Sequence, residues 1–181
     1  FYSGLMLEGR MTDTFFKAAR IGKVVYPVTE LLDEAFLLEP PEFEGHWDPH
    51  VWMDVSAWSQ AVESVATALC EQDADHCVAF RANATAYRKE LAALHAYAKE
   101  SIGSIPESSR VLITAHDAFN YFGRAYGIEV VGVQGLSTES EAGIDDVNKL
   151  VNMLVDRGIS AVFVESSVSD RNVRALVEGA A

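Results

Sequence analysis

A long helical pattern from about Val78 to Ile102 constrains the fold of this chain more than any other feature. Its apolar residues recur at helical spacing, at Phe80, Ala84, Tyr87, Leu91, Leu94 and Ala98. Gly103 and Pro106 then end the pattern. With a rise of about 1.5 Å per residue, such a helix is about 37 Å long, which is more than one layer of a small compact domain requires. The pattern therefore predicts a spine that connects two halves of the molecule.

The sequence after this helix alternates between strand and helix patterns. Strands are expected at residues 110–115, 128–133 and 161–166, and helices at residues 116–127, 144–158 and 169–179. This alternation predicts a parallel sheet that is covered by helices on both faces. In open sheets of this kind, ligands bind at the carboxyl ends of the strands.

The sequence before the long helix is less regular. A short helix is expected at residues 12–22, a strand at residues 23–28, and a long loop rich in acids and proline at residues 29–49. Ser56 is the expected N-cap of a further helix. The apolar positions of that helix are Trp58, Val62, Val65 and Leu69. We therefore divide the chain into an N-terminal lobe at residues 1–76, a linking spine helix at residues 77–104 and a C-terminal α/β lobe at residues 105–181.

Composition and charge exclude several classes of protein. The chain is 49% apolar and 23% charged, which is typical of a globular protein with a substantial core. The net charge of −13 argues against nucleic-acid binding, because an acidic surface repels phosphate. No apolar run reaches the roughly 18 residues that a membrane span needs. No signal-peptide pattern is present at Phe1 and no evident final element closes the sequence, so we expect a piece cut at both ends.

The two cysteines, Cys70 and Cys77, flank a short segment that is expected to turn from one helix into the next. One interpretation is a pair of partly buried thiols. The other is a disulfide, which would indicate an oxidising compartment. The short turn predicts that the two residues lie close enough to pair.

His116 directly follows a predicted strand and is therefore the best-placed titratable residue of the sheet. It is either a ligand or a histidine whose ring bonds to a nearby backbone group. Asp117 is a candidate hydrogen-bond partner of a metal-binding histidine, or simply the N-cap of the next helix. Glu165 ends another predicted strand and is a candidate ligand, an acceptor for an imidazole N–H, or a capping acid.

His50 lies in the sequence DPHVW, just ahead of a predicted helix. Asp48 and Pro49 restrict the backbone there. A metal site requires such a fixed histidine, but an ordinary helix start can have the same sequence. His46 is expected to be exposed. The remaining histidines, His76 and His95, are expected to be solvated or to pack against neighbours.

The motifs of common enzyme classes are missing from this sequence. It contains no nucleophile elbow, no Walker loop and no G-x-G-x-x-G. Neither cysteine has a base at a recognisable spacing. The residues therefore indicate no covalent or redox mechanism, and we expect a protein that is not an enzyme.

Five motifs occur in order along the whole chain: GLMLEGRM, DPHVWMDV, TAHDAFNYFGRAYG, GVQGLSTESEAG and AVFVESSVSDRNV. Together they resemble the cluster A-I zinc/manganese solute-binding proteins of bacterial ABC transporters, of the TroA-like type. The resemblance implies a fold with two α/β lobes that contain parallel sheets and are joined by one long rigid helix. It also implies a metal ion held between the lobes by four side chains, two from each lobe.

The resemblance assigns two metal ligands to this chain. The histidine of D-P-H-x-W is His50, and the histidine of A-H-D is His116. Some manganese-specific relatives have a glutamate in place of His116. The family's other two ligands, an upstream histidine and a downstream aspartate, lie outside this chain, so both lobes are expected to be incomplete and Zn²⁺ or Mn²⁺ to bind weakly or not at all. Residues 39–50 contain only His46 and His50, which argues against a dedicated zinc importer.

The resemblance therefore predicts an extracytoplasmic protein, periplasmic or attached to the cell surface, that captures Zn²⁺ or Mn²⁺ and delivers it to the membrane permease of an ABC importer. Two alternatives remain open. The first is an adhesin or interaction domain of the same fold, for which partner binding would be insensitive to chelators. The second is a metallohydrolase, in which Glu165 or Asp117 would serve as the acid beside a metal-bound water.

Overall fold

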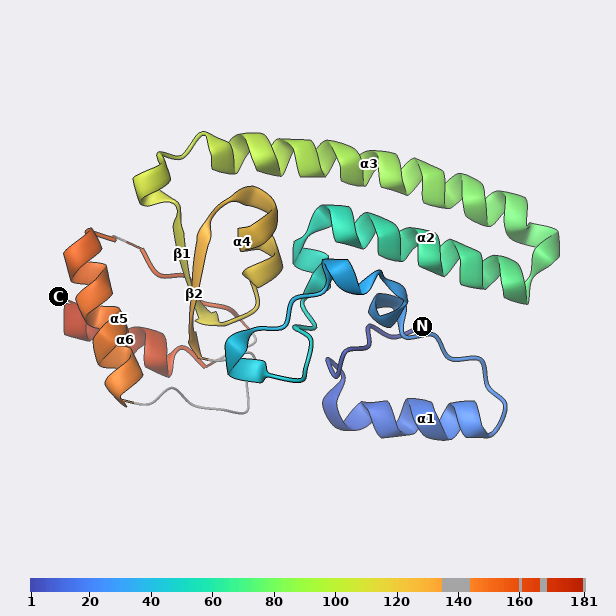
Figure 1. The fold of residues 1–181 in the computed structure, drawn as a ribbon, viewed down its shortest axis with the longest axis horizontal. Coiled ribbons are helices and arrows are strands. Elements are labelled where there is room, and N and C mark those ends of the chain that lie inside the picture. The colour runs from blue at the N-terminus through green and yellow to red at the C-terminus, as the bar shows by residue number, and fades with distance from the viewer. Residues whose placement is uncertain (135–143, 160, 167–168, 181) are drawn as a thin grey trace. The chain divides into compact units, whose positions relative to one another are not determined.

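The computed structural model describes residues 1–134, 144–159, 161–166 and 169–180 (Figure 1). The chain forms two compact units, Phe1–Ala98 and Lys99–Ala181. Mixed helices and a parallel sheet, together with one long helix, agree with the predicted fold class. Most of the motif GVQGLSTESEAG, at residues 135–143, lies outside the described residues, as do residues 167–168 of the last motif.

The predicted spine is a single helix, α3, at Cys77–Gly103. Its apolar stripe is narrower than predicted, because only Ala84 and Leu91 are buried. Tyr87 and Leu94 are 45% and 49% exposed. The two buried residues lie seven positions apart, which is two helical turns, so the helix packs along a narrow seam.

The helix before it, α2, spans Val55–Gln72. Its N-cap is Asp54 rather than the predicted Ser56. The carboxylate of Asp54 accepts hydrogen bonds from the backbone N–H (2.9 Å) and the hydroxyl (2.6 Å) of Ser56. Asp54 has the extended backbone of a cap, whereas Ser56 already belongs to the first turn. The positions predicted to be apolar are half-buried, and the fully buried side of α2 consists of alanines.

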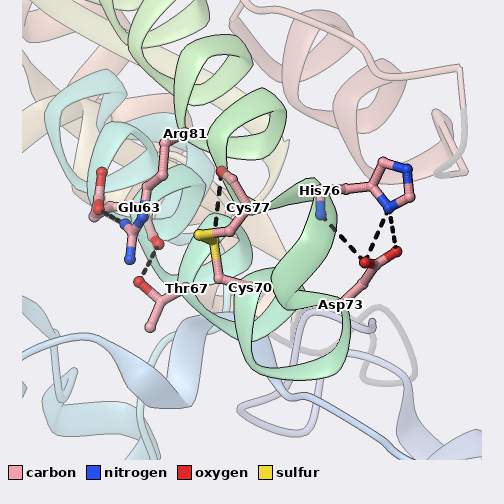
Figure 2. Close-up of a disulfide and its surroundings, with 7 residues drawn as sticks. All are labelled: Glu63, Thr67, Cys70, Asp73, His76, Cys77 and Arg81. Atoms are coloured by element: carbon pink, nitrogen blue, oxygen red, sulfur yellow. Dashed lines mark hydrogen bonds and ion pairs between the residues drawn. A yellow bond between two sulfur atoms is a disulfide. The ribbon is translucent and has the colours of Figure 1, made fainter.

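A disulfide between Cys70 and Cys77 joins the end of α2 to the start of α3 (Figure 2). The Cα atoms are 4.6 Å apart, which confirms that the two cysteines are close enough to pair. Farther along the same two helices, the Glu63 carboxylate accepts hydrogen bonds from Arg81 and, at 2.9 Å, from Arg88. The α2–α3 hairpin is therefore held both covalently and by an ion-pair cluster.

The rest of the first unit consists of helix α1, at Thr12–Arg20, and short 3-10 turns. The helix starts where it was predicted and ends two residues earlier. These turns lie at Gly9–Met11, Val28–Leu31, Glu34–Phe36, Pro41–Phe43, Val51–Met53 and Ala74–His76. The strand predicted at residues 23–28 is wrong. Only one isolated parallel bridge forms, between Tyr2 and Pro27. The bridge consists of the Tyr2 N–H donating to the Tyr26 carbonyl at 3.0 Å and the Val28 N–H donating to the Tyr2 carbonyl at 2.9 Å. Beyond it, the Gly4 N–H donates to the Glu8 carboxylate at 3.2 Å instead of extending the ladder.

The second unit contains a parallel pair of strands, β1 (Val111–His116) and β2 (Glu129–Gln134). The third predicted strand, at residues 161–166, forms only a single parallel bridge, between Phe163 and Thr114. Helix α4, at Asn120–Tyr126, begins four residues later than predicted because β1 continues through His116. Its N-cap position is Phe119, so Asp117 does not cap it.

Two further helices supply the core of this unit, α5 at Ile144–Arg157 and α6 at Arg171–Ala180. Their apolar side chains pack with those of the strands, and the buried cluster contains Ile113, Ala115, Val133, Leu150, Leu154, Val173 and Leu176. This packing fixes β1 and hence the backbone of His116 at its carboxyl end. Among the helices in the described part of the chain, none is long and apolar enough to cross a membrane.

Candidate metal centre

Each unit contains one buried histidine whose ring nitrogen is bonded to a carboxylate. His50 belongs to the first unit and His116 to the second. They are 6% and 8% exposed, respectively, so both rings are largely shielded from water.

His50 is held by Asp48, two residues earlier. The Asp48 carboxylate accepts hydrogen bonds from the His50 backbone N–H at 2.9 Å and from ring atom Nδ1 at 2.7 Å. Asp48 itself is completely buried, and its backbone N–H donates to the carbonyl of Leu38 at 2.8 Å. This is an Asx turn, in which an aspartate accepts from the backbone two residues on. The local sequence D-P-H therefore sets the ring orientation of His50.

The residues after His50 complete its surroundings. They form a 3-10 turn, Val51–Met53, in which Val51 is fully buried and the Met53 N–H donates to the His50 carbonyl at 3.1 Å. The ring of Trp52 meets the imidazole edge-on, with centroids 5.4 Å apart. Hydrogen bonds thus hold the backbone and ring atom Nδ1 of His50, and Trp52 contacts its ring.

His116 is held by Glu165, from a segment forty-nine residues later in the chain. The Glu165 carboxylate lies 2.8 Å from His116 Nδ1 and accepts the His116 backbone N–H at 3.2 Å. Glu165 reaches this position because the chain before it runs beside β1, where the Phe163 N–H donates to the Ile113 carbonyl at 2.8 Å. The cross-strand pairing therefore delivers the carboxylate to the histidine.

The backbone around His116 is tightly packed as well. The buried hydroxyl of Thr114 donates to the His116 carbonyl at 2.8 Å. On the adjacent strand, a Cβ atom added to Gly132 would lie only 2.6 Å from the backbone nitrogen of Asp117. Glycine at position 132 thus allows the residue after the histidine to lie directly against β2.

The two pairs share one chemical consequence. A carboxylate that accepts from Nδ1 favours the tautomer with its proton on Nδ1, which leaves the Nε2 lone pair to bind a cation. The same partner fixes the orientation of the ring. Histidines of this kind are suited to metal binding, because neutral imidazole nitrogen is a common ligand of Zn²⁺ and of other transition metals.

His46 and His76 are more exposed to solvent than His50 and His116. His76 also has a carboxylate partner, Asp73, with Nδ1 2.8 Å from Oδ2, but its side chain is 69% exposed. His46 is exposed as predicted. Nowhere among the described residues do three or more side chains of the metal-binding types come together.

Sequence reasoning identified both buried histidines, and it named Glu165 as a possible acceptor for an imidazole N–H. It gave Asp48 only a backbone role and missed its bond to the ring of His50. The signal was present, because an aspartate two residues before a histidine can accept from both its N–H and its ring. Asp117 lies beside His116, and its backbone rather than its carboxylate explains the close packing on Gly132.

Comparisons with known proteins agree over the whole chain. The family described as ZnuA, zinc-uptake complex component A periplasmic, matches residues 1–181. The manganese-binding lipoprotein MntA of Bacillus subtilis (strain 168) is 46% identical over 180 residues, which are 99% of this chain and 58% of the relative. The zinc-binding protein TroA of Treponema pallidum (strain Nichols) is 42% identical over 177 residues, 97% of this chain and 56% of the relative.

Comparison of structures leads to the same group of proteins. The solved structure of the periplasmic zinc binding protein TroA from Treponema pallidum matches with a TM-score of 0.92 and 40% sequence identity, over 99% of this chain and 64% of that chain. The chain thus spans between one half and two thirds of the length of these relatives. None of the relatives named here is described as an enzyme. From the match over all 181 residues, the chain belongs to the ZnuA family of periplasmic zinc-uptake components.

Proposed function

We propose that this chain is part of an extracytoplasmic solute-binding protein that captures Zn²⁺ or Mn²⁺ and delivers it to the membrane permease of an ABC importer. The observation that carries the proposal is the pair of buried histidines, His50 and His116, each with Nδ1 bonded to a carboxylate. The family description, a periplasmic component of an uptake complex, supports the permease as partner and a location in the periplasm or at the cell surface.

In this proposal, His50 and His116 are ligands that bind the same ion through Nε2. Asp48 and Glu165 hold the two rings in place. Residues 1–76 and 105–181 contribute one histidine each, and residues 77–104 connect them. Capture needs no general base and no open coordination position, in keeping with a binding protein.

The identity of the ion depends on the ligand set. Two imidazoles suit Zn²⁺, whereas Mn²⁺ binds better as oxygen ligands are added. The relatives divide in the same way, since one is named for manganese and another for zinc. The proposal therefore covers both ions, and titration with each decides between them.

Calorimetric titration of the metal-stripped chain with Zn²⁺ and with Mn²⁺ tests the proposal. His50→Ala and His116→Ala are each expected to lower the affinity at least about tenfold. His76→Ala is the matched control, because its ring also bonds to a carboxylate but lies on an exposed turn. Its affinity should equal that of the unmodified chain.

A double-mutant cycle extends this test. If both imidazoles bind one ion, the loss in the double variant differs from the sum of the single losses, because the two ligands are coupled. Metal binding should also weaken as the pH falls through the range in which imidazole takes up a proton, since protons and metal compete for the same nitrogen. Tight binding that neither single variant changes would overturn the assignment.

A further inference from the structure

Another buried carboxylate, that of Asp54, lies close to His50 in the sequence and has no part in the metal centre described above. Asp54 is 5% exposed, and a buried carboxylate is stable only where hydrogen bonds compensate for the water that it loses. As the N-cap of α2, it meets that condition. Its carboxylate accepts from the Ser56 N–H at 2.9 Å, from the Ser56 hydroxyl at 2.6 Å and from the Ala57 N–H at 3.4 Å.

The backbone of Asp54 belongs to the turn that follows His50. Its N–H donates to the Val51 carbonyl at 3.1 Å, in the same 3-10 turn in which the Met53 N–H donates to the His50 carbonyl at 3.1 Å. Its own carbonyl accepts the Trp58 N–H at 2.9 Å, in a bond that begins the helical ladder of α2. Asp54 therefore ends the turn after His50 and begins the helix, with no residue between the two elements.

Helix α2 gives this junction a firm base. Its first turn is packed, because Ala57 is fully buried, and Val51 on the other side of the junction is fully buried too. The first N–H groups of a helix have no partner within the helix, so the order of that turn depends on a cap. The backbone of His50 is therefore fixed to a packed helix only as long as Asp54 caps it.

We propose that Asp54 is a positioning residue for metal capture, which couples the placement of His50 to the order of the first turn of α2. The inference rests on the proposed function, because it takes His50 as a metal ligand. Asp48 fixes the ring of His50 relative to its own backbone. Asp54 fixes that backbone relative to α2, and so it acts on the ligand only through the turn between them.

Coupling of this kind is reciprocal. If the cap holds His50 in its binding orientation, an ion bound to His50 must in turn stabilise the cap. Metal binding is therefore expected to slow amide hydrogen exchange at Ser56 and Ala57, whose N–H groups donate to the Asp54 carboxylate. A bound ion would then order the start of α2 as well as the ligand itself.

Three substitutions at position 54 test the proposal. Asp54→Ala removes the cap, whereas Asp54→Asn and Asp54→Ser keep a side-chain oxygen that can accept from the first turn. In the metal-free protein, Asp54→Ala should speed amide exchange at Met53 as well as at Ser56, because the turn after His50 is no longer fixed to the helix. Zinc affinity, measured by competition with a chromophoric chelator, should fall about fivefold in Asp54→Ala, the factor that corresponds to a typical lost N-cap. The asparagine and serine variants should recover most of this loss.

Asp73→Ala is the matched control. Asp73 is an aspartate cap in the same unit, since its carboxylate accepts the His76 N–H at 3.3 Å at the start of the 3-10 turn after α2 (Figure 2). Its removal deletes a cap of the same chemistry at the far end of α2 and leaves the turn after His50 intact. Metal-free exchange at Met53 and zinc affinity should both equal those of the unmodified chain.

Different results would overturn this inference and the proposed function. If the unmodified chain binds zinc and Asp54→Ala binds it equally well, the positioning role alone is wrong. Unchanged exchange at Met53 in metal-free Asp54→Ala would also exclude that role, whether or not the chain binds zinc. An equal loss of affinity in Asp73→Ala would attribute the effect to general destabilisation of the first unit. Absence of zinc binding by the unmodified chain would overturn the proposed function, and this inference with it.

Discussion

Replacement of Asp48 by asparagine separates the orientation of His50 from the stability of the loop around it. Asparagine has the shape of aspartate, and its carbonyl oxygen can still accept the two hydrogen bonds that Asp48 accepts from His50, at 2.7 and 2.9 Å. The substitution therefore removes the negative charge while leaving acceptors in place. Replacement by alanine would instead leave buried donors without a partner.

The expected loss of metal affinity follows from the strength of the hydrogen bond between Asp48 and His50 that the substitution weakens. A hydrogen bond to a charged group contributes about 1.5–3 kcal/mol, against about 1 kcal/mol for a neutral pair. Loss of the charge is therefore expected to cost about 1–2 kcal/mol of metal binding, because the ring is held less firmly in its binding orientation. That corresponds to about a tenfold loss of affinity, at the lower end of the tenfold to hundredfold range for residues behind a metal ligand.

The assay is competition for Zn²⁺ between the chain and a chromophoric chelator at one fixed pH. Urea unfolding of the metal-free variant, measured in parallel, is expected to change little, since both hydrogen bonds persist. Glu165→Gln should act in the same direction on His116. The loss of zinc affinity in Glu165→Gln is expected to be smaller than in Asp48→Asn, because the Glu165 side chain is 20% exposed whereas that of Asp48 is completely buried.

Asp73→Asn is the control for Asp48→Asn. Asp73 bonds to His76 Nδ1 at 2.8 Å, but that pair lies in solvent. Unchanged zinc affinity in Asp48→Asn, or the same loss in Asp73→Asn, would refute the argument that a buried carboxylate tunes a metal-binding imidazole here.

Three further outcomes are expected. Cys70→Ser with Cys77→Ser should destabilise the first unit by about 2.5 kcal/mol in urea unfolding, since the bridge closes a loop with a sequence separation of 7. Gly132→Ala should lower both the stability of the second unit and its zinc affinity, because the added Cβ would lie 2.6 Å from a backbone nitrogen after β1. Hydrogen bonds from Arg157 hold the pKa of Glu129 below its ordinary value, so Glu129→Gln should slightly lower the urea midpoint at neutral pH. That difference should disappear in acid, because a carboxylate with a lowered pKa loses its stabilising effect as the pH falls through its folded-state value.

Local sequence was sufficient where structure depends on neighbours along the chain. The long helix was predicted almost to its ends, since its start and stop signals are local. The sequence did not predict which of its apolar residues are buried, because burial depends on what packs against the helix. Tyr87 and Leu94 fit the pattern and remain exposed. The prediction of a strand at residues 23–28 failed for a related reason, since strand-like residues form no sheet without a partner strand, and these residues make only the single bridge between Tyr2 and Pro27.

In the candidate site, too, the features set by neighbours along the chain could be predicted, and those set by distant segments could not. His50 and His116 could be named from motifs, and the bond from Asp48 could have been inferred from a two-residue spacing. The bond between His116 and Glu165 was foreseeable only as one of several roles for Glu165. It depends on Phe163 pairing with Thr114, at a point where the predicted strand is reduced to one bridge. No local pattern specifies that pairing.

The two histidine–carboxylate pairs should therefore respond differently when the protein is destabilised. The His50 pair joins residues two apart, so forming it closes almost no loop. The His116 pair joins residues forty-nine apart and exists only while the segment at Phe163 lies along β1. In moderate urea, ring-nitrogen NMR signals of His116 should reach their unfolded values together with the core around Ile113, whereas those of His50 should follow the first unit. A common transition at both histidines, with no difference between the units, would show that their carboxylate partners are not fixed independently.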